Sequence, residues 1–318
     1  MRIDGHVHFV GDGSNGSGCW LRRNLGDRLF EPIVKSQAGI YRMSQKLGVD
    51  HAYEEKLIKL IQDSSLDAIL LLAMDYPYDP DGNCRKAEAK FYVPNDHVLN
   101  LARKFPEIIP ACSIHPARKD AIEELERSAE QGAKVLKLLP NCHDVDCSDS
   151  QYGAFWEKLA KLGLPFLAHT GGEFSVPVLN AKFADPRVLR LPLECGVKVI
   201  AAHGAGKSGL WDPDYTKDLL KMMGEFPNLF TDNSALASPN RWRTISALLD
   251  PRIQSRVIHG SDFPIPVGGF GPWLGKLLSN SDYSESRKIK NPLERDVFIK
   301  QAVGFEESTF IRLGDLIF

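Results

Sequence analysis

The sequence predicts an α/β protein folded as a single (β/α)8 TIM barrel. Eight short, mostly apolar segments alternate with segments whose apolar residues recur at helical spacing. The chain has 318 residues, 43% hydrophobic and 25% charged, which is the composition of an ordinary globular protein. Barrels of this length commonly form one domain, and no Pro/Ser-rich linker divides the chain, so we expect one domain over residues 1–318.

The expected strands are short and end in polar or proline residues. The run from Leu66 to Met74 shows the pattern, because a continuous apolar stretch of this length is typical of a parallel strand buried on both faces. The eight segments cover residues 2–8, 66–74, 108–114, 133–139, 164–169, 197–203, 229–233 and 256–262.

Helical periodicity fills most of the intervals between these strands. Asn95 is a favourable residue for the start of one helix, and apolar residues at helical spacing mark the others. The expected helices cover residues 54–63, 95–105, 120–131, 152–162, 187–194, 215–226, 242–249 and 294–303. Residues 304–318 are predicted to form a terminal helix and tail packed on the outside. The long segments 11–39 and 268–281 are expected to be the loops that select the substrate.

Composition excludes several classes of partner. The formal net charge is −2 and no run of Lys and Arg is present, which argues against binding to nucleic acid. The longest apolar run, residues 68–74, is far shorter than the roughly 20 residues that cross a bilayer. No cationic, apolar leader precedes the first strand, so we expect a cytoplasmic protein with no membrane association. The six cysteines are expected to be reduced thiols, and the Cys142, His143 and Cys147 spacing matches no recurrent zinc pattern.

His6 and His8 point to a metal site. Side chains two residues apart in a strand leave the same face, so these two imidazoles can share one metal ion. In a (β/α)8 barrel the carboxyl ends of all strands meet at one mouth, where His169 and Asp262 would complete a ligand set suited to zinc. His203 ends the strand that follows His169 and is expected to act as a general base or to polarise a carbonyl.

Four motifs, in order, resemble the amidohydrolase superfamily, in particular the amidohydrolase-related branch that includes aminocarboxymuconate-semialdehyde decarboxylase and the pyrone-dicarboxylate lactonases. They are residues 4–8, 168–173, 202–204 and 259–264, and they span the chain from the first strand to the eighth. The resemblance implies His6, His8, His169 and Asp262 as ligands of one divalent metal ion, zinc in the first place and manganese in the second. It also implies His203 as the catalytic histidine, and it makes a homodimer an expectation.

Two departures from the binuclear members favour a single metal ion. Those members bridge two ions with a carbamylated lysine at the end of the fourth strand, a position close to Lys137. We expect Lys137 to face the substrate or to form a salt bridge instead, with carbamylation left as the alternative. We also expect the small β-sandwich domain of many such proteins to be absent, because the first barrel strand begins at the N-terminus.

The expected reaction is hydrolysis of a C–O or C–N bond in a small, carboxylate-bearing lactone, amide or ester. Metal-activated water would attack the carbonyl, Asp262 would carry the proton to the leaving group, and His203 would stabilise the oxyanion. The alternative is a metal-dependent non-oxidative decarboxylase, which needs a cationic clamp that Arg22, Arg23 or Arg42 could supply. Hydroxybenzoate decarboxylases often have Glu-x-His on the first strand, whereas this chain has His6-Val7-His8.

Three further residues are expected to contact the substrate because they lie at or near predicted strand ends: Lys137, Glu173 and Asn233. A different class is suggested by residues 204–208, which end in the Gly-Lys-Ser of a phosphate-binding loop. The signature requires a glycine where this chain has Ala201, so we expect no NTPase, although Lys207 could bind an anionic group of the substrate. A metal-free barrel that only binds a ligand is the remaining alternative.

Overall fold

The computed structural model describes residues 1–22, 39–209 and 211–318. Eight parallel strands form one sheet, in which each strand pairs with the next along the chain. They are β1 (Ile3–His8), β3 (Ala68–Leu72), β5 (Ile108–Cys112), β6 (Val135–Leu138), β7 (Phe166–Ala168), β8 (Val199–Ala201), β9 (Leu229–Asp232) and β10 (Val257–Ile258). Hydrogen bonds from Gly5 N to His259 O and from Asp262 N to His6 O, both 2.8 Å, join the last strand to the first. The predicted (β/α)8 barrel is therefore confirmed.

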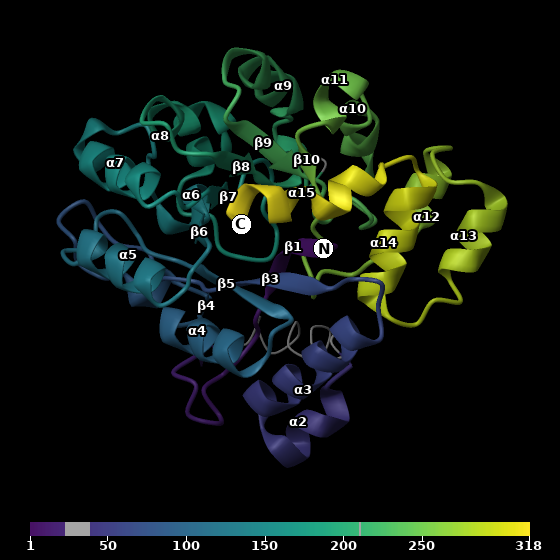
Figure 1. Ribbon diagram of the computed structural model, residues 1–318, viewed down its shortest axis with the longest axis horizontal. Coiled ribbons are helices and arrows are strands. Elements are labelled where there is room, and N and C mark those ends of the chain that lie inside the picture. Colours follow the sequence, from purple (N-terminus) through teal and green to yellow (C-terminus); the bar gives the residue numbers. More distant parts are fainter. Residues whose placement is uncertain (23–38, 210) are drawn as a thin grey trace.

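Helices surround the strands, as Figure 1 shows. Those of the first half are α2 (Tyr41–Leu47), α3 (Val49–Gln62), α4 (Asn95–Lys104), α5 (Ala121–Glu130), α6 (Pro140–His143) and α7 (Gly153–Lys161). Those of the second half are α8 (Arg190–Glu194), α9 (Thr216–Glu225), α10 (Ile245–Leu248), α11 (Pro251–Gln254), α12 (Phe270–Leu274), α13 (Asn280–Ser286), α14 (Pro292–Ala302) and α15 (Glu307–Ile317). The expected helix over 187–194 divides into a 3-10 turn at Pro186–Leu189 and α8.

The barrel interior is a separate apolar core. Alternate residues of the strands point inward, and the inward set joins one buried cluster while their neighbours pack against the helices. The interior cluster consists of Ile3, Ala68, Leu70, Leu72, Ile109, Ala111, Val135, Leu167, Ile200, Ala202, Ile258 and Leu313. Alternation along each strand thus decides which strand-end residues face the mouth of the barrel.

The position of the terminal helix differs from the expectation. Residues 304–318 do form a helix, α15, but it lies across the centre of the view in Figure 1 rather than only on the outside. Leu313 of this helix belongs to the interior cluster, and its side chain approaches Gly5 of β1. The helix therefore closes the end of the barrel that is opposite the strand carboxyl ends, because an apolar interior left open there would be wetted.

A bulge in β1 aims the two histidines. The register between β1 and β3 shifts between Asp4 and Val7. Ile3 faces the barrel interior and Val7 packs in the outer layer. Strict alternation would put Val7 on the same side as Ile3, so the extra residue resets the phase and turns His6 and His8 inward. Bulges beside active sites often re-aim side chains in this way.

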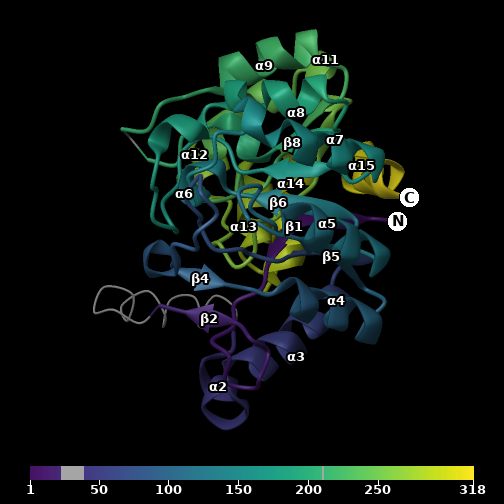
Figure 2. The ribbon, with the colours of Figure 1, turned by 90° about the vertical axis from the view of Figure 1, so that its left-hand side faces the viewer.

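A small antiparallel ribbon that the sequence analysis did not predict lies beside the mouth. It pairs β2 (Trp20–Leu21) with β4 (Phe91–Tyr92). Figure 2 shows both strands on the side of the molecule away from the two termini. The ring of Phe91 lies 6.4 Å from the ring of His8 in an edge-to-face arrangement. The ribbon therefore brings aromatic side chains to the histidine cluster.

The expected specificity loops are partly described. Most of the first loop, residues 23–38, lies outside the described residues. Its earlier part is held by the buried Asp50, which accepts hydrogen bonds from Asp12 N at 2.7 Å and from Ser17 Oγ at 2.6 Å. The second loop, residues 268–281, contains α12.

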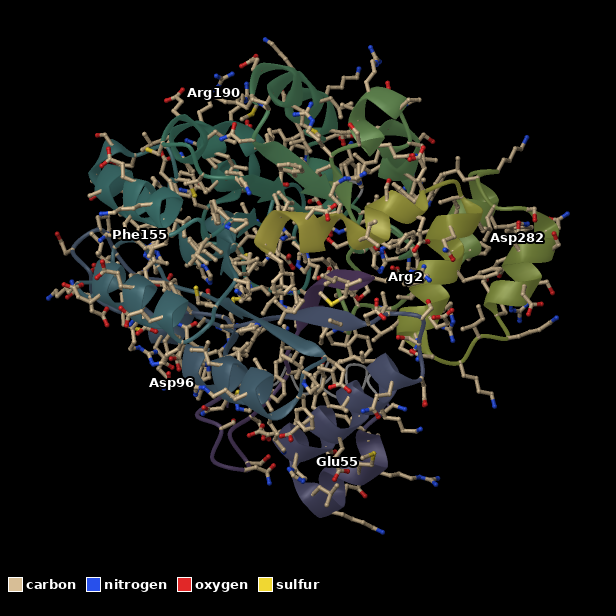
Figure 3. The ribbon with its side chains drawn as sticks, viewed as in Figure 1. Arg2, Glu55, Asp96, Phe155, Arg190 and Asp282 are labelled. Carbon is tan, nitrogen blue, oxygen red and sulfur yellow. The ribbon has the colours of Figure 1, made fainter. Side chains whose placement is uncertain are left out.

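Several charged side chains of the outer helices point away from the barrel. Figure 3 shows Glu55, Asp96 and Asp282 at the periphery, whereas Arg2 lies near the centre of the view. The Arg2 guanidinium stacks over the Phe310 ring of α15, with 5.0 Å between its carbon and the ring centroid. Among the described helices, none is long and apolar enough to span a membrane.

Candidate metal centre and active site

Three predicted ligands converge at the mouth of the barrel. His6 and His8 come from β1, and Asp262 follows β10. The Nε2 atom of His6 lies 3.4 Å from Asp262 Oδ1, and Nε2 of His8 lies 3.2 Å from the same oxygen. One donor atom from each residue falls within 4.8 Å of the other two, close enough for a single ion to bind all three. Imidazole and carboxylate together are a donor set that suits Zn²⁺.

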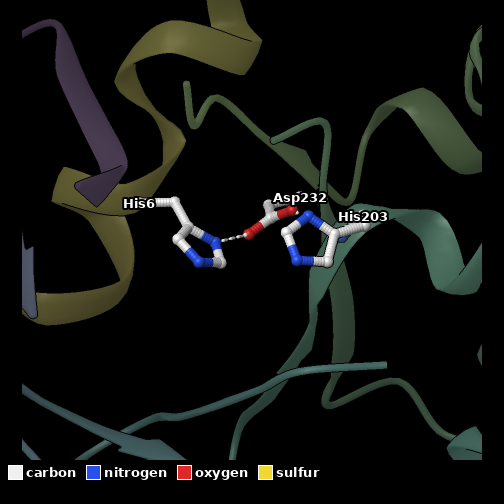
Figure 4. A group of neighbouring side chains, drawn as sticks. All are labelled: His6, His203 and Asp232. Atoms are coloured by element: carbon white, nitrogen blue, oxygen red, sulfur yellow. Dashed lines mark hydrogen bonds and ion pairs between the residues drawn. The ribbon is translucent and has the colours of Figure 1, made fainter. Parts of the chain in front are cut away.

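Asp232 orients the ring of His6 through a contact with its Nδ1 atom. Its Oδ2 lies 2.7 Å from Nδ1 of His6, as Figure 4 shows, and its Oδ1 accepts a hydrogen bond from the backbone N–H of His203 at 2.7 Å. The Ser234 N–H also donates to Oδ1, at 3.1 Å. Burial alone would raise the pKa of Asp232, but its contacts with His6 lower it overall. An ionised Asp232 therefore keeps the proton of His6 on Nδ1, so that Nε2 is unprotonated and can bind a metal ion.

His6, His203 and Asp232 form a second group whose donor atoms lie within 4.8 Å of one another. Both oxygens of Asp232 are already engaged by protein donors in this group. The group that contains Asp262 keeps a partly accessible ligand, because His8 retains 17% exposure of its side chain. We therefore place the candidate metal ion in the first group and give Asp232 a supporting role.

His169, the fourth predicted ligand, lies next to this cluster with one free nitrogen. Its Nδ1 is 3.2 Å from Nε2 of His203, and its buried Nε2 has no hydrogen-bond partner among the described residues. Glu173 Oε2 is 3.4 Å from that nitrogen. Burial, followed by the positive charge of Arg241, lowers the pKa of both His169 and His203 well below the ordinary range. A buried, neutral imidazole nitrogen without a hydrogen-bond partner among the described residues is suited to bind a metal ion.

The protonation states around His6 also match those of metal ligands. Burial, followed by the charge of Lys137, lowers the pKa of His6 to about 4. Burial alone would raise the pKa of Asp262, but the neighbouring His6 and His8 rings lower it to about 2. The cluster thus presents neutral imidazole from His6 and ionised carboxylate from Asp262 at neutral pH, and no proton has to be displaced from these ligands before a cation binds.

Lys137 lies inside the ligand cluster rather than at its edge. Its side chain is fully buried, and Nζ is 3.3 Å from Nε2 of His6. Burial lowers the pKa of Lys137 to about 8. A lysine with this pKa is partly neutral near pH 8, which is the form that carbamylation requires. Its predicted contact with the substrate stays a prediction.

Two candidate residues have strained backbones. His203 has a φ of 61° and Asp262 a φ of 64°, in the left-handed region that non-glycine residues seldom adopt. Such a conformation costs about 1–3 kcal/mol per residue and persists where surrounding structure enforces it. Here the N–H of His203 is held by Asp232, and the N–H of Asp262 is held by the His6 carbonyl. Strain of this kind concentrates at functional sites, in agreement with the roles predicted for both residues.

The two other predicted substrate contacts are placed differently. The Oε1 atom of Glu173 accepts hydrogen bonds from the N–H groups of residues 174–176, which leaves Oε2 directed at His169. Asn233 is fully buried, and its Oδ1 accepts a hydrogen bond from Gly260 N at 3.1 Å. The structure therefore brings Glu173 to the cluster, whereas Asn233 supports the junction of β9 and β10.

The remaining histidine and cysteine candidates form a separate buried region. His115 Nε2 lies 3.0 Å from the carbonyl oxygen of His143. Cys142 and Cys147 are buried free thiols. Neither of the metal-capable groups within residues 1–22, 39–209 and 211–318 contains any of these four residues. The expectation that they hold no zinc stays a prediction.

Backbone amides at the end of the Gly-Lys-Ser segment bind a carboxylate of the chain itself. Asp212 Oδ2 accepts hydrogen bonds from Ser208 N at 3.1 Å and from Gly209 N at 2.6 Å. These amides would face the phosphate in a nucleotide-binding loop. Lys207 is exposed on the same segment. The geometry therefore supports neither a nucleotide site nor the anion site considered for Lys207.

Sequence analysis also missed two residues of the site. The cationic candidates were Arg22, Arg23 and Arg42, but Arg42 is exposed on α2 and Arg23 lies outside the described residues. The buried arginine near the cluster is Arg241, which follows β9. Asp232 was missed because Asn233 was taken as the inward strand-end residue. Strand alternation was the available signal, since Phe230 packs against the barrel interior and Asp232 lies two residues further on.

Comparison with known proteins identifies the family. The family model described as amidohydrolase matches residues 3–289. No curated protein matches the chain. An uncharacterised TIM-barrel protein from Bordetella bronchiseptica has 17% identity and a TM-score of 0.57, covering 94% of this chain and 99% of its own. A Pseudomonas putida protein assigned by name as a 2-pyrone-4,6-dicarboxylic acid hydrolase has 15% identity and a TM-score of 0.53, covering 96% of this chain and 98% of its own.

A third similar structure contains a bound metal ion. It is a dihydroxybenzoic acid decarboxylase from Polaromonas sp. JS666 with bound manganese and the inhibitor 2-nitroresorcinol. Its identity is 16% and its TM-score 0.51, with 95% of this chain and 96% of its own covered. At such identities these structures establish the shared barrel, whereas the family model spans most of the sequence. The chain therefore belongs to the amidohydrolase family of enzymes.

Proposed function

We propose that this protein is a metal-dependent hydrolase that cleaves a C–O or C–N bond in a small carboxylate-bearing molecule. The observation that carries the proposal is the convergence of His6, His8 and Asp262 beside the unpartnered Nε2 of His169. These four residues would hold one divalent ion. We propose zinc, with manganese as the second choice because the Polaromonas decarboxylase binds it. A bound divalent ion lowers the pKa of a water molecule from 15.7 to about 7, which supplies a nucleophile at neutral pH.

Residues of the chain would handle the protons. Asp262 is ionised and retains some exposure, so it can accept a proton and return it to a leaving group. The Ser234 Oγ lies 2.8 Å from Nδ1 of His203 and fixes the orientation of that ring. His203 Nε2 then points into the cluster toward His169, where an unprotonated nitrogen can act as a general base.

The aromatic ribbon favours a planar substrate. Phe91 meets the ring of His8, and next to it the rings of Tyr76 and Tyr92 stack at 4.2 Å with 5° between their planes. Trp20 continues this surface 6.1 Å from Tyr76. A wall of aromatic faces beside polar ligands suits a ring with delocalised bonds, such as an unsaturated lactone.

A decarboxylase with the same ligands is the second candidate. It is favoured by two buried cations near the cluster, Lys137 and Arg241, since a departing carboxylate needs a cationic partner. The two reactions differ in their products. Hydrolysis of a lactone releases an acid that a pH indicator detects, whereas decarboxylation releases CO₂.

The test loads the purified protein with zinc and, separately, with manganese, and assays unsaturated lactones, cyclic amides and hydroxybenzoates for both products. We expect acid release from a lactone, or ring opening of a cyclic amide to its amino acid without net acid release, at a rate reduced about 10²–10³-fold or more in His169→Ala and in Asp262→Ala. Circular dichroism of both variants should match the wild type. Release of CO₂ alone would transfer the assignment to the decarboxylase. Near-normal rates in both variants would refute the metal-site assignment.

A further inference from the structure

Arg241 is a buried arginine whose hydrogen bonds within the protein are incomplete. It lies after β9, in front of the 3-10 turn Trp242–Thr244, and is only 6% exposed. Nη2 donates to the Gly172 carbonyl, and Nη1 donates to the Gly206 carbonyl at 3.5 Å. A guanidinium has five N–H groups, so the described residues leave three of them without a partner.

The carboxylates around Arg241 are engaged elsewhere. Those closest in electrostatic terms belong to Glu173, Asp262 and Asp212, yet the described residues show no ion pair with the arginine. Glu173 is bound by backbone amides, Asp262 lies against the two β1 histidines, and Asp212 caps its own loop. An arginine cannot lose its proton in a protein, and an unpaired buried charge is costly. The guanidinium of Arg241 therefore lacks an anionic partner among the described residues.

Arg241 also lies close to the candidate metal centre. Its guanidinium bonds to the carbonyls of Gly172 and Gly206, which lie three residues after His169 and His203 respectively. The loops that it contacts follow β7 and β8, the strands that carry these histidines. An anion on the free face of the guanidinium would therefore lie at the edge of the histidine cluster.

We propose that Arg241 binds a carboxylate group of the substrate and positions the substrate against the metal centre. The planar fork of a guanidinium matches both oxygens of a carboxylate, a geometry that lysine cannot reproduce. The inference rests on the proposed function only in that the bound molecule is the substrate of this centre. It assigns to Arg241 the selection of an anionic over a neutral substrate.

A purely structural role is the competing explanation, because Arg241 also ties together the loops at Gly172 and Gly206. The two roles differ in their effect on ligand charge. Loss of a tie between loops would weaken all ligands alike, whereas loss of a carboxylate partner would weaken a dicarboxylate more than a monocarboxylate of the same shape. Arg243, two residues away and exposed, is a matched control for removal of a positive charge.

The experiment measures, by calorimetry on the zinc-loaded protein, the dissociation constants of isophthalate and of 3-carbamoylbenzoate, in which one carboxylate is replaced by an amide. We expect wild type and Arg243→Met to bind isophthalate about 10- to 100-fold more tightly than the amide. Arg241→Met should lose this preference, and Arg241→Lys should recover only part of it. Melting temperature and zinc content would show that each variant is folded and loaded.

The proposal is overturned if Arg241→Met weakens both ligands equally or keeps the preference, or if wild-type protein does not distinguish them. Calorimetry requires no turnover, so the two proposals fail separately. A preference lost in Arg241→Met together with no hydrolysis of any lactone or amide would support Arg241 and refute the hydrolase. Hydrolysis together with an unchanged preference in Arg241→Met would support the hydrolase and refute the role of Arg241.

Discussion

The Nδ1 atom of His6 lies 2.7 Å from Oδ2 of Asp232, although 226 residues separate the two in the sequence. Asp232 is at the end of β9 and His6 is in β1, so the contact crosses the barrel mouth from one strand end to another. A carboxylate behind a ligating imidazole selects its tautomer and strengthens it as a ligand. This contact explains how a fully buried histidine presents its Nε2 atom to a cation.

Asp232→Asn should weaken metal binding without unfolding the barrel. We expect the affinity for zinc to fall about 10–100-fold, because an amide cannot hold the Nδ1 proton of His6 as a carboxylate does. Competition with a chromophoric chelator would measure the change. Ser234→Ala removes the hydroxyl partner of His203 and Asp232 but keeps the charge, so its effect should be smaller. Unchanged affinity in Asp232→Asn would contradict the role given to this residue.

The number of bound metal ions would show whether Lys137 is carbamylated. Plasma mass spectrometry of wild-type protein should find about one equivalent of zinc or manganese, and His169→Ala should lose most of it, because one of the four proposed ligands is removed and the remaining three bind the ion more weakly. Two equivalents in wild type and fewer in Lys137→Met would instead identify a carbamylated bridge. No metal in protein purified without chelators would favour the ligand-binding barrel.

Lys300 should be essential for stability although it lies outside the cluster. It is fully buried, and Nζ lies 2.5 Å both from Asp296 Oδ2 and from the Gly260 carbonyl oxygen. Lys300→Met leaves the buried carboxyl of Asp296 and the Gly260 carbonyl without their partner, so we expect a loss of about 1–3 kcal/mol in the free energy of unfolding. Urea denaturation would measure it.

The exposed ion pair of Lys288 and Glu285, at 2.7 Å, supplies the matched comparison. Lys288→Met should cost less than about 1 kcal/mol. Adding Asp296→Leu to Lys300→Met should restore much of the lost stability, because no buried carboxyl without a partner then remains. A double variant no more stable than Lys300→Met would show that the loss comes from packing or from the Gly260 carbonyl.

Asp296 should make the stability depend on pH. Burial raises the pKa of Asp296 to about 7, although Lys300 acts against the rise. The folded state therefore holds this proton more tightly than the unfolded chain, whose carboxyl titrates near 3.9. The contribution of the group is most favourable at low pH and is lost as the pH rises toward 7.

Asp296→Asn cannot ionise and should remove this dependence. Between pH 5 and pH 8 the wild type should lose about 2–3 kcal/mol of unfolding free energy more than the variant does. Urea titrations of both proteins at the two pH values would give the difference, and all other titrating groups cancel in it. Parallel pH profiles would show that Asp296 is not protonated in the folded protein below pH 7.

Local pattern was sufficient for the fold and for much of the candidate site. Apolar runs such as residues 66–74 and the alternation of strands with helices predict the barrel, because parallel strands buried on both faces need continuous apolar sequence. The strand-end positions of His6, His8, His169 and Asp262 then follow from topology, since the barrel brings every strand end to one mouth.

Only the tertiary structure decided which neighbours support these residues. One position along β9 separates Asp232, which holds His6, from Asn233, which bonds to Gly260, and strand alternation sends the two side chains to opposite faces. Arg241 and Glu173 reach the cluster from loops, whose paths depend on hydrogen bonds between segments distant in sequence. The sequence by itself therefore determined the barrel and its candidate ligands, while long-range packing decided the residues that orient them and the cation available to a substrate.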